Sequence, residues 1–267
     1  MTVRSRSAGT AVYLYCLVSS RKRPSLVRVP RGLPNATPPR VLDAGGSLWL
    51  VVADVPLEEY GERAIARHLK DLEWVTTRAI AHESVVERFA GADAVVPSKL
   101  FTMFRTDDRA VGYVVGARKR LDGVVASVAG SLEWGVRIGA SSPPAGLGAA
   151  PERGRGSRPA TKASTGAEFL KRKRALRSAE RTAHERRVRA AHDTLATLST
   201  FARGVVTRPP AVSSPGLLLD AAFLVPRRNT ERFRSAVAKA RDRLHRVRAT
   251  VTLTGPWPPY HFIADPS

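Results

Sequence analysis

The chain has 267 residues, of which 44 are Lys or Arg and 23 are Asp or Glu, so its formal net charge is +21. This length suffices for one large domain or two small ones, and a hydrophobic content of 43% is enough to form a core. The charge favours anionic partners such as nucleic acid, an acidic protein or a membrane surface, while the single cysteine excludes an intrachain disulfide and indicates a reducing compartment.

The first elements of the chain are predicted to be a tail, a strand and a long loop. Residues 1–10 are expected to form a disordered tail, and Val12–Val18 is an apolar run that predicts a buried strand and is too short to span a membrane. Basic residues precede this run, as in a secretory signal peptide, but no small-residue cleavage site follows it, so we do not expect secretion. Residues 19–47 are rich in Pro, Gly and Arg and predict a long loop, with a short strand at Val41–Leu42.

A second strand and a helical region follow. The run Leu48–Val55 predicts a strand that is buried on both faces. After Pro56 the apolar residues recur with helical spacing, which predicts two helices, the second of which ends at Gly91. Ala94–Pro97 and Lys99–Phe104 together predict one strand with a break at the proline.

The centre of the chain predicts a helix, a strand and a linker. Asp107–Val128 predicts one helix, whose first residues are acids and are therefore favoured at the positive end of the helix dipole. Leu132–Ile138 alternates between apolar and polar residues and predicts a strand. Residues 140–166 are mainly Ser, Pro, Gly, Ala and Arg and predict a disordered linker or insertion.

The last part of the chain alternates between helices and strands. A long helix with a narrow apolar stripe and a broad cationic face is predicted at 167–203. A second helix is predicted to start with Asn229 or Thr230 as its cap. The complete predicted series is a helix at 167–203, a strand at 217–226, a helix at 229–246 and a strand at 249–255.

This alternation of strands and helices predicts an α+β fold of two small domains. The back half has the element content of a small α+β sandwich of the ferredoxin-like type. The expected boundaries are a disordered tail at 1–10, an N-terminal α+β domain at 11–105, a C-terminal α+β domain with a long basic helix at 106–139 and 167–263, and a disordered linker at 140–166.

No catalytic constellation can be assembled from the sequence. It lacks a nucleophile-elbow motif, a phosphate-binding loop and a dinucleotide-binding motif, and it offers no set of nucleophile, base and orienting group. His184 and His192 share a face of the predicted long helix, but no carboxylates accompany them, so we expect solvated histidines and no metal site. The acids lie at helix starts or on polar faces, with the exception of Glu133 beside Trp134 in a strand. We therefore expect a protein that is not an enzyme and that uses no cofactor.

The predicted long helix carries the main candidates for partner binding. Its basic residues allow a nucleic-acid-binding interpretation, in which counterion release makes the affinity depend on salt. A solvated, salt-bridged face is the alternative, and three glutamates at helical pairing distances from the arginines favour it. The candidate partner-binding residues are Lys171, Arg172, Lys173, Arg174, Arg186 and Arg187.

The C-terminal segment is stiff and aromatic. Gly255 permits an unusual φ, and the three prolines that follow fix φ and are expected to end strand pairing. The aromatic rings bring large apolar areas, which favours a clasp that holds the domain together over an exposed docking strip. The candidate structural residues are Trp134, Gly255, Pro256, Trp257, Pro258, Pro259 and Tyr260.

Several segments, in matching order, resemble those of the gas vesicle protein F/L family. Thr250–Phe262 resembles the C-terminal signature of this family, and Leu132–Val136 resembles its Glu-Trp-Gly strand. The other similar segments are Val12–Tyr15, Ala94–Pro97, Phe101–Phe104, Gly166–Lys173 and Asp220–Pro226. The resemblance spans residues 11–263, and the chain departs from the family pattern at Ser98–Phe101 and in its long basic loop at 19–47.

The resemblance implies a non-enzymatic accessory protein of gas vesicle assembly, found in the cytoplasm as a minor component of the gas vesicle. Such a protein is expected to bind the small hydrophobic shell protein, together with other accessory vesicle proteins, and to help nucleate the vesicle or prevent premature aggregation. The implied fold has two α+β domains, the first of which is a modified ferredoxin-like domain. No specific nucleic acid, cofactor or transmembrane segment is expected, and a basic nucleic-acid-binding protein remains the alternative.

Overall fold

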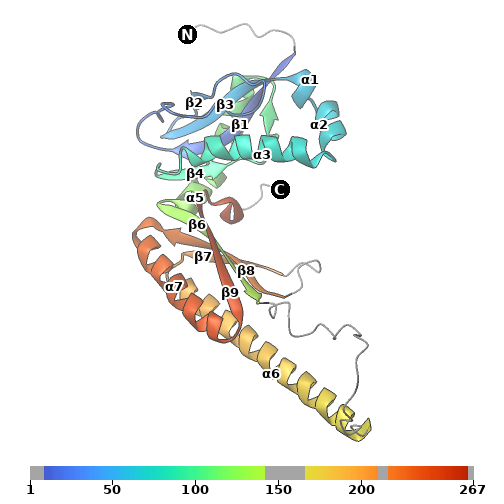
Figure 1. Cartoon of the computed structure of the whole chain (residues 1–267). Coiled ribbons are helices and arrows are strands. Elements are labelled where there is room, and N and C mark those ends of the chain that lie inside the picture. Colours follow the sequence, from blue (N-terminus) through green and yellow to red (C-terminus); the bar gives the residue numbers. More distant parts are fainter. Residues whose placement is uncertain (1–8, 142–165, 210–215, 264–267) are drawn as a thin grey trace. The chain divides into compact units, whose positions relative to one another are not determined.

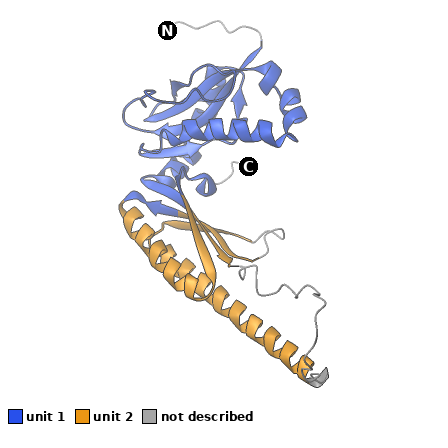
Figure 2. Ribbon diagram, in the orientation of Figure 1, with its two compact units in different colours: residues 1–134, 224–227, 255–267 blue, residues 135–223, 228–254 orange. Residues whose placement is uncertain are grey.

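The structure is a computed structural model that describes residues 9–141, 166–209 and 216–263 (Figure 1). The chain divides into two compact units (Figure 2). Unit 1 comprises residues 1–134, 224–227 and 255–267, and unit 2 comprises residues 135–223 and 228–254. Residues 106–134 therefore cluster with unit 1, whereas the expected boundary assigns them to the C-terminal domain.

Unit 1 is built on an antiparallel sheet with the order β2-β3-β1-β4, in which β5 also pairs with β1. Its strands are β1 (Thr10–Ser19), β2 (Arg40–Asp43), β3 (Leu48–Pro56), β4 (Ala94–Pro97) and β5 (Met103–Phe104). β1 lies in the middle of the sheet, and all of its residues except the two terminal ones are buried. This position explains why β1 is a continuous apolar run and not an alternating one, because both of its faces are covered.

The two faces of β1 belong to two separate cores. Tyr13 and Tyr15 pack in a cluster with Val85 and Val86 of α3 (Leu72–Glu87). Leu14, which points to the opposite face, packs in a cluster with residues of α4 (Asp107–Gly116) and α5 (Arg118–Val128). The sheet is thus covered by α3 on one face and by α4 and α5 on the other, which is why α4 and α5 belong to unit 1.

Two helical predictions in unit 1 were wrong in their number of helices. The region after Pro56 forms three helices, α1 (Leu57–Tyr60), α2 (Glu62–His68) and α3, because Asp71 starts a new helix by accepting a hydrogen bond from the Trp74 N–H. Residues 107–128 form α4 and α5 in place of one helix. The break falls at Ala117, directly after Gly116, and glycine is a poor helix former.

Unit 2 contains most of a four-stranded sheet with the order β7-β8-β6-β9 and the helices α6 and α7. Its elements are β6 (Ser131–Ala140), α6 (Gly166–Ser199), β7 (Gly204–Arg208), β8 (Leu217–Pro226), η1 (Arg227–Asn229), α7 (Thr230–Arg246) and β9 (Ala249–Trp257), and η2 (Tyr260–Phe262) follows them. β7 was missed, because residues 200–203 were assigned to the helix and no element was predicted between 203 and 217. With β7 included, the order is βαββαβ, the ferredoxin-like series.

The two sheets have the same strand order. When the strands are numbered within each sheet, both β2-β3-β1-β4 and β7-β8-β6-β9 become second, third, first, fourth. A loop at residues 20–39 stands between β1 and β2, where unit 2 has the helix α6. The mixed α and β content predicted from the sequence is confirmed by these two sheets and their helices.

Two local predictions in the last part of the chain were wrong. β9 continues through Pro256 to Trp257, because β9 is an edge strand, and proline is tolerated there since one side of the strand has no partner strand. Asn229 makes no side-chain cap for α7; its side-chain amide instead donates a hydrogen bond to the carbonyl oxygen of Phe201 at 3.0 Å.

Candidate functional site

The helix α6 exposes the first half of its length. Every residue from Glu168 to Thr182 is exposed, and the first buried residue of the helix is Ala191. The exposed residues include large apolar side chains: Phe169 is 61% exposed and Leu176 is 58% exposed. Most helices in proteins are stabilised by packing an apolar face, so the first half of α6 presents an amphipathic surface that no described residue of the chain covers.

All six predicted partner-binding residues lie on α6, but they do not form one patch. Lys171–Arg174 are exposed at consecutive positions and therefore point to different sides of the helix, as a basic collar. Arg186 and Arg187 lie about 18 Å or more farther along the helix axis, at a rise of about 1.5 Å per residue. Arg187 is half-buried, because α6 begins to pack at this point, and Glu185 pairs with Arg181 at 3.1 Å.

The C-terminal segment makes the contacts that a structural role requires. Gly255 has a φ of 106°, and a Cβ at this position would lie 2.8 Å from the carbonyl oxygen of Glu133, so only glycine fits. Pro258 and Pro259 are buried. Phe262 packs against the cluster that contains Leu224, Ala94 and Val128, which joins the end of the chain to the core of unit 1.

A buried carboxylate also holds this segment. Glu133 of β6 is 3% exposed, and both of its oxygens are used by His261. The backbone N–H of His261 donates to Oε2 at 2.9 Å, and its ring Nδ1 lies 2.5 Å from Oε1. The neighbouring Trp134 is 5% exposed, whereas Trp257 is 37% exposed, so the two predicted structural tryptophans have different environments.

Beside this contact lies a cavity of about 590 Å³ within unit 1, which we call the carboxylate pocket. One face of α3 supplies part of its lining, and β6 and the C-terminal segment supply the rest. Its lining residues are Ala79, Ile80, Glu83, Ser84, Glu87, Glu133, Trp257, Tyr260 and His261. Three glutamates and two large aromatic side chains thus share one cavity in a chain of net charge +21.

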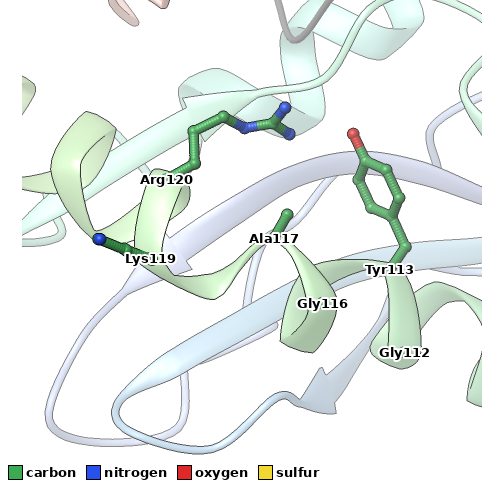
Figure 3. A pocket seen from close by; sticks show the side chains of 6 residues that line it. All are labelled: Gly112, Tyr113, Gly116, Ala117, Lys119 and Arg120. Atoms are coloured by element: carbon green, nitrogen blue, oxygen red, sulfur yellow. The ribbon is translucent and has the colours of Figure 1, made fainter.

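Two other cavities are lined by cationic side chains. The first, of about 860 Å³, lies where α4 meets α5 (Figure 3). Its lining includes Tyr113 and Arg120, whose polar ends face a common space, while Lys119 points away from them. The second, of about 480 Å³, is lined by Thr197 of α6, by Phe201 just after this helix and by residues of α7 that include Lys239 and Arg243. None of the predicted partner-binding residues lines either cavity.

The core of unit 1 contains one buried tyrosine–histidine pair. The Tyr13 hydroxyl lies 2.7 Å from His82 Nδ1, and His82 is only 4% exposed. Burial lowers the pKa of His82 to about 4, so the ring is neutral at neutral pH. His184 and His192, for which solvated side chains were expected, are both exposed. Burial also raises the pKa of the Cys16 thiol, which keeps this side chain protonated and unreactive.

Two negative findings concern the described residues, one on metal-ligand clusters and one on helices. Within residues 9–141, 166–209 and 216–263, no group of three or more His, Cys, Asp and Glu side chains is placed to hold a metal ion. A separate finding concerns the helices: in the part of the chain that the structure describes, none is both long enough and apolar enough to cross a membrane.

The sequence analysis missed Glu83 and Glu87, which line the carboxylate pocket. Their spacing of four residues places them on one face of a helix, and this signal was available from the sequence. Their proximity to Glu133 and Trp257 was not available, because these residues are distant along the chain. Arg78 was also missed, since a buried arginine cannot be distinguished from an exposed one by its helical position alone.

Three comparisons relate the chain to known proteins. The sequence model of the family described as "Gas vesicle synthesis protein GvpL/GvpF" matches residues 11–264. Gas vesicle protein L of Streptomyces sp. (strain CB03234) is 28% identical over 232 residues, which cover 84% of this chain and 83% of that protein. The crystal structure of GvpF from Anabaena sp. PCC7120 has a TM-score of 0.65 at 17% identity, with 97% of this chain and 98% of that one covered. The crystal structure of GvpF from Microcystis aeruginosa has a TM-score of 0.63 at 17% identity, with coverages of 96% and 99%.

Proposed function

This chain belongs to the GvpL/GvpF family of gas vesicle synthesis proteins, and from this premise we propose that it binds the small hydrophobic shell protein and helps to nucleate the vesicle. Membership of this family supports a role in gas vesicle assembly. On this proposal that role is structural and not enzymatic. On this proposal the protein associates with the gas vesicle as a minor component, and other accessory vesicle proteins are further partners.

The observation that carries the proposal is the uncovered first half of α6. Phe169, Leu170 and Leu176 are each more than half exposed among the cations of the basic collar. Apolar side chains in such a position bind an apolar partner surface, and the surrounding charges keep the free protein soluble. Hydrophobic shell subunits need such a partner, because exposed apolar surface and free strand edges cause aggregation before assembly.

The cationic residues add selectivity to this contact. Charge complementarity raises the association rate and orients the partners more than it raises the affinity. We therefore expect the basic collar, Lys171–Arg174, to meet acidic groups of the shell protein or of a second accessory protein. Arg186 and Arg187 are expected to contribute less, because they lie farther along α6 and Arg187 is half-buried.

The test is co-expression with the cognate small shell protein, followed by affinity capture from nuclease-treated lysate at moderate salt. The wild-type chain is expected to recover soluble shell protein. The variant Phe169→Ala/Leu176→Ala should recover at least tenfold less, because buried aromatic and aliphatic anchors dominate interface affinity. A chain that is soluble by itself and captures no shell protein would overturn the proposal.

A matched pair of charge variants tests the basic collar. Lys171→Glu, Arg172→Glu, Lys173→Glu and Arg174→Glu in one chain should reduce recovery of the shell protein. The control reverses four exposed cations of α7, and it changes the net charge by the same amount. Its positions are Lys239, Arg241, Arg243 and Arg246. Equal losses in the two variants would show that net charge matters and that the position of the collar does not.

Nucleic-acid binding is the second candidate, and the broad cationic surface of α6 is the observation that favours it. A protein that neutralises several phosphates loses affinity steeply as salt rises, through counterion release. Titration of duplex DNA and of RNA at two salt concentrations distinguishes the two functions. A steep salt dependence that disappears in the collar variant, together with no capture of shell protein, would favour nucleic acid.

A further inference from the structure

The carboxylate pocket has the composition of a binding site, and the proposed function leaves it unused. Its volume of about 590 Å³ is in the range of sites that enclose a small molecule or a long side chain. One face of α3 forms part of the lining, with Ile80 65% exposed beside the glutamates. All of its lining residues belong to unit 1, so the site is complete within one compact unit.

Two of the three carboxylates in the pocket lack a counter-ion. Glu83 and Glu87 are one turn apart on α3, so both side chains leave the helix on the same side. The Glu133 carboxylate accepts a hydrogen bond from the backbone N–H of His261, whereas the side-chain carboxylates of Glu83 and Glu87 make no hydrogen bond or ion pair with any described residue. Burial raises the pKa of Glu83, and the charges of Glu87 and Glu133 raise it further. A cation between these carboxylates would remove their repulsion.

The aromatic side chains supply the other half of the site. Trp257, a residue that is 37% exposed, lines the pocket. A cation over an indole face is stabilised by the ring quadrupole. Tyr260 also lines the pocket, and its buried hydroxyl has no hydrogen-bond partner among the described residues. Burial is the main cause that raises the pKa of Tyr260, so its hydroxyl stays neutral. A buried polar atom without a partner is uncommon.

A basic amino-acid side chain matches all of these features. Its charge complements Glu83 and Glu87, and its aliphatic stem can lie against Ile80. A bare metal ion matches less well, since no three His, Cys, Asp or Glu side chains of the described residues are placed as ligands. Arginine is favoured over lysine, because the planar guanidinium stacks on an indole and offers several donors in a fixed fork.

We propose that the carboxylate pocket binds an arginine or lysine side chain of a partner polypeptide, with Glu83 and Glu87 as its counter-ions and Trp257 as its stacking surface. The strong positive charge of the chain repels basic molecules at long range, so recognition here must come from short-range contacts within the pocket. The proposal concerns unit 1 only and does not depend on α6 or on the shell protein. Its failure is therefore distinguishable from failure of the proposed function.

The test uses the full chain labelled with 5-fluorotryptophan. The four tryptophans give four fluorine resonances, and Trp257→Phe identifies the one from position 257. N-acetylarginine methylamide is the probe, N-acetyl-lysine methylamide is the second probe, and the neutral isostere N-acetylcitrulline methylamide is the control, all at matched ionic strength. We expect a saturable shift of the Trp257 resonance with the arginine probe, weaker binding of the lysine probe, and at least tenfold weaker binding of citrulline.

Variants locate the site. Glu83→Gln/Glu87→Gln should weaken binding of the arginine probe at least fivefold. The melting temperature should stay unchanged or rise, because these carboxylates have no partners to lose among the described residues. Glu58→Gln/Glu62→Gln, which removes two exposed carboxylates at α1 and α2, is the matched control and should bind as the wild type does. The proposal is overturned if no saturable shift occurs, if citrulline binds as tightly as arginine, or if both double variants bind equally.

Discussion

The buried guanidinium of Arg78 tests how unit 1 is held together around α3, the helix that also carries the carboxylate pocket. Arg78 is 8% exposed, and it forms an ion pair with Glu59 of α1. Its Nη1 donates to the carbonyl oxygen of Trp74 at 3.2 Å, and its guanidinium lies 3.9 Å from the centre of the Trp74 ring. Arg78 therefore combines an ion pair, a hydrogen bond and a cation–π contact in one buried group.

Replacing Arg78 by methionine keeps most of the aliphatic volume but removes the charge. Breaking a buried ion pair by removing one partner costs about 3–5 kcal/mol. The Glu59 side chain keeps 21% of its exposure and a hydrogen bond from Asn35 at 2.8 Å, so solvent screens part of this cost. We expect Arg78→Met to lower the free energy of unfolding by about 2–3 kcal/mol. Arg78→Lys keeps the charge and loses the planar stack, and it should cost about 1 kcal/mol.

The measurement is urea unfolding of the full chain, followed by hydrogen exchange of the α3 amides. This local probe is needed because two compact units need not unfold in one transition. Arg78→Met/Glu59→Gln should be more stable than the sum of the single losses predicts, since the second change removes the unpaired charge. A loss below about 0.5 kcal/mol for Arg78→Met, or simple additivity of the two changes, would refute the reasoning.

Three further predictions concern protonation and the C-terminal segment. Because burial lowers the pKa of His82 from 6.5 to about 4, the unfolded state binds a proton first as the pH falls. The free energy of unfolding should then decline as the pH falls from 6.5 to 4, by at most about 1.4 kcal/mol per pH unit. In His82→Phe, the free energy of unfolding should depend less on pH in this range. Gly255→Ala should lower the free energy of unfolding by about 2–4 kcal/mol, because φ is positive at this position and a Cβ would collide with the Glu133 carbonyl oxygen. Gly91→Ala, whose Cβ would lie in open space, should leave the free energy of unfolding unchanged, and equal denaturant midpoints for the two variants would contradict this prediction. Trp257→Ala should lower the melting temperature by a few degrees if the C-terminal segment is a clasp. An unchanged melting temperature together with lost partner binding would favour the interpretation of this segment as an exposed docking strip.

The strands with the most buried residues could be predicted from the sequence. Val12–Val18 is a continuous apolar run, and Leu48–Val55 is interrupted only by Asp54. Both lie in strands of the unit 1 sheet, where β1 is covered on both faces. β7 could not be predicted in the same way, because its five residues are mostly half-buried and show no alternation. Short edge strands depend on the neighbouring strand for their conformation and carry little pattern of their own.

Of the candidate binding surfaces, one could be predicted from the sequence and one could not. The exposed basic residues of α6 could be predicted, since charge runs at helical spacing are local features. The division of those residues into a collar and a distant pair follows from helix geometry alone. The carboxylate pocket could not be predicted, because α3, Glu133 and the C-terminal segment meet only in the folded chain.

By itself the sequence determined the resemblance to a gas vesicle family, the α+β content, the net charge and the long basic helix, because each depends on composition or on patterns within short segments. Tertiary structure alone decided that Glu133 is buried against His261, 128 residues away, and that Glu83 and Glu87 face the same cavity as Trp257. The physical reason is that the charge state and accessibility of a side chain depend on what covers it. For these residues the covering groups come from parts of the chain whose proximity no local pattern encodes.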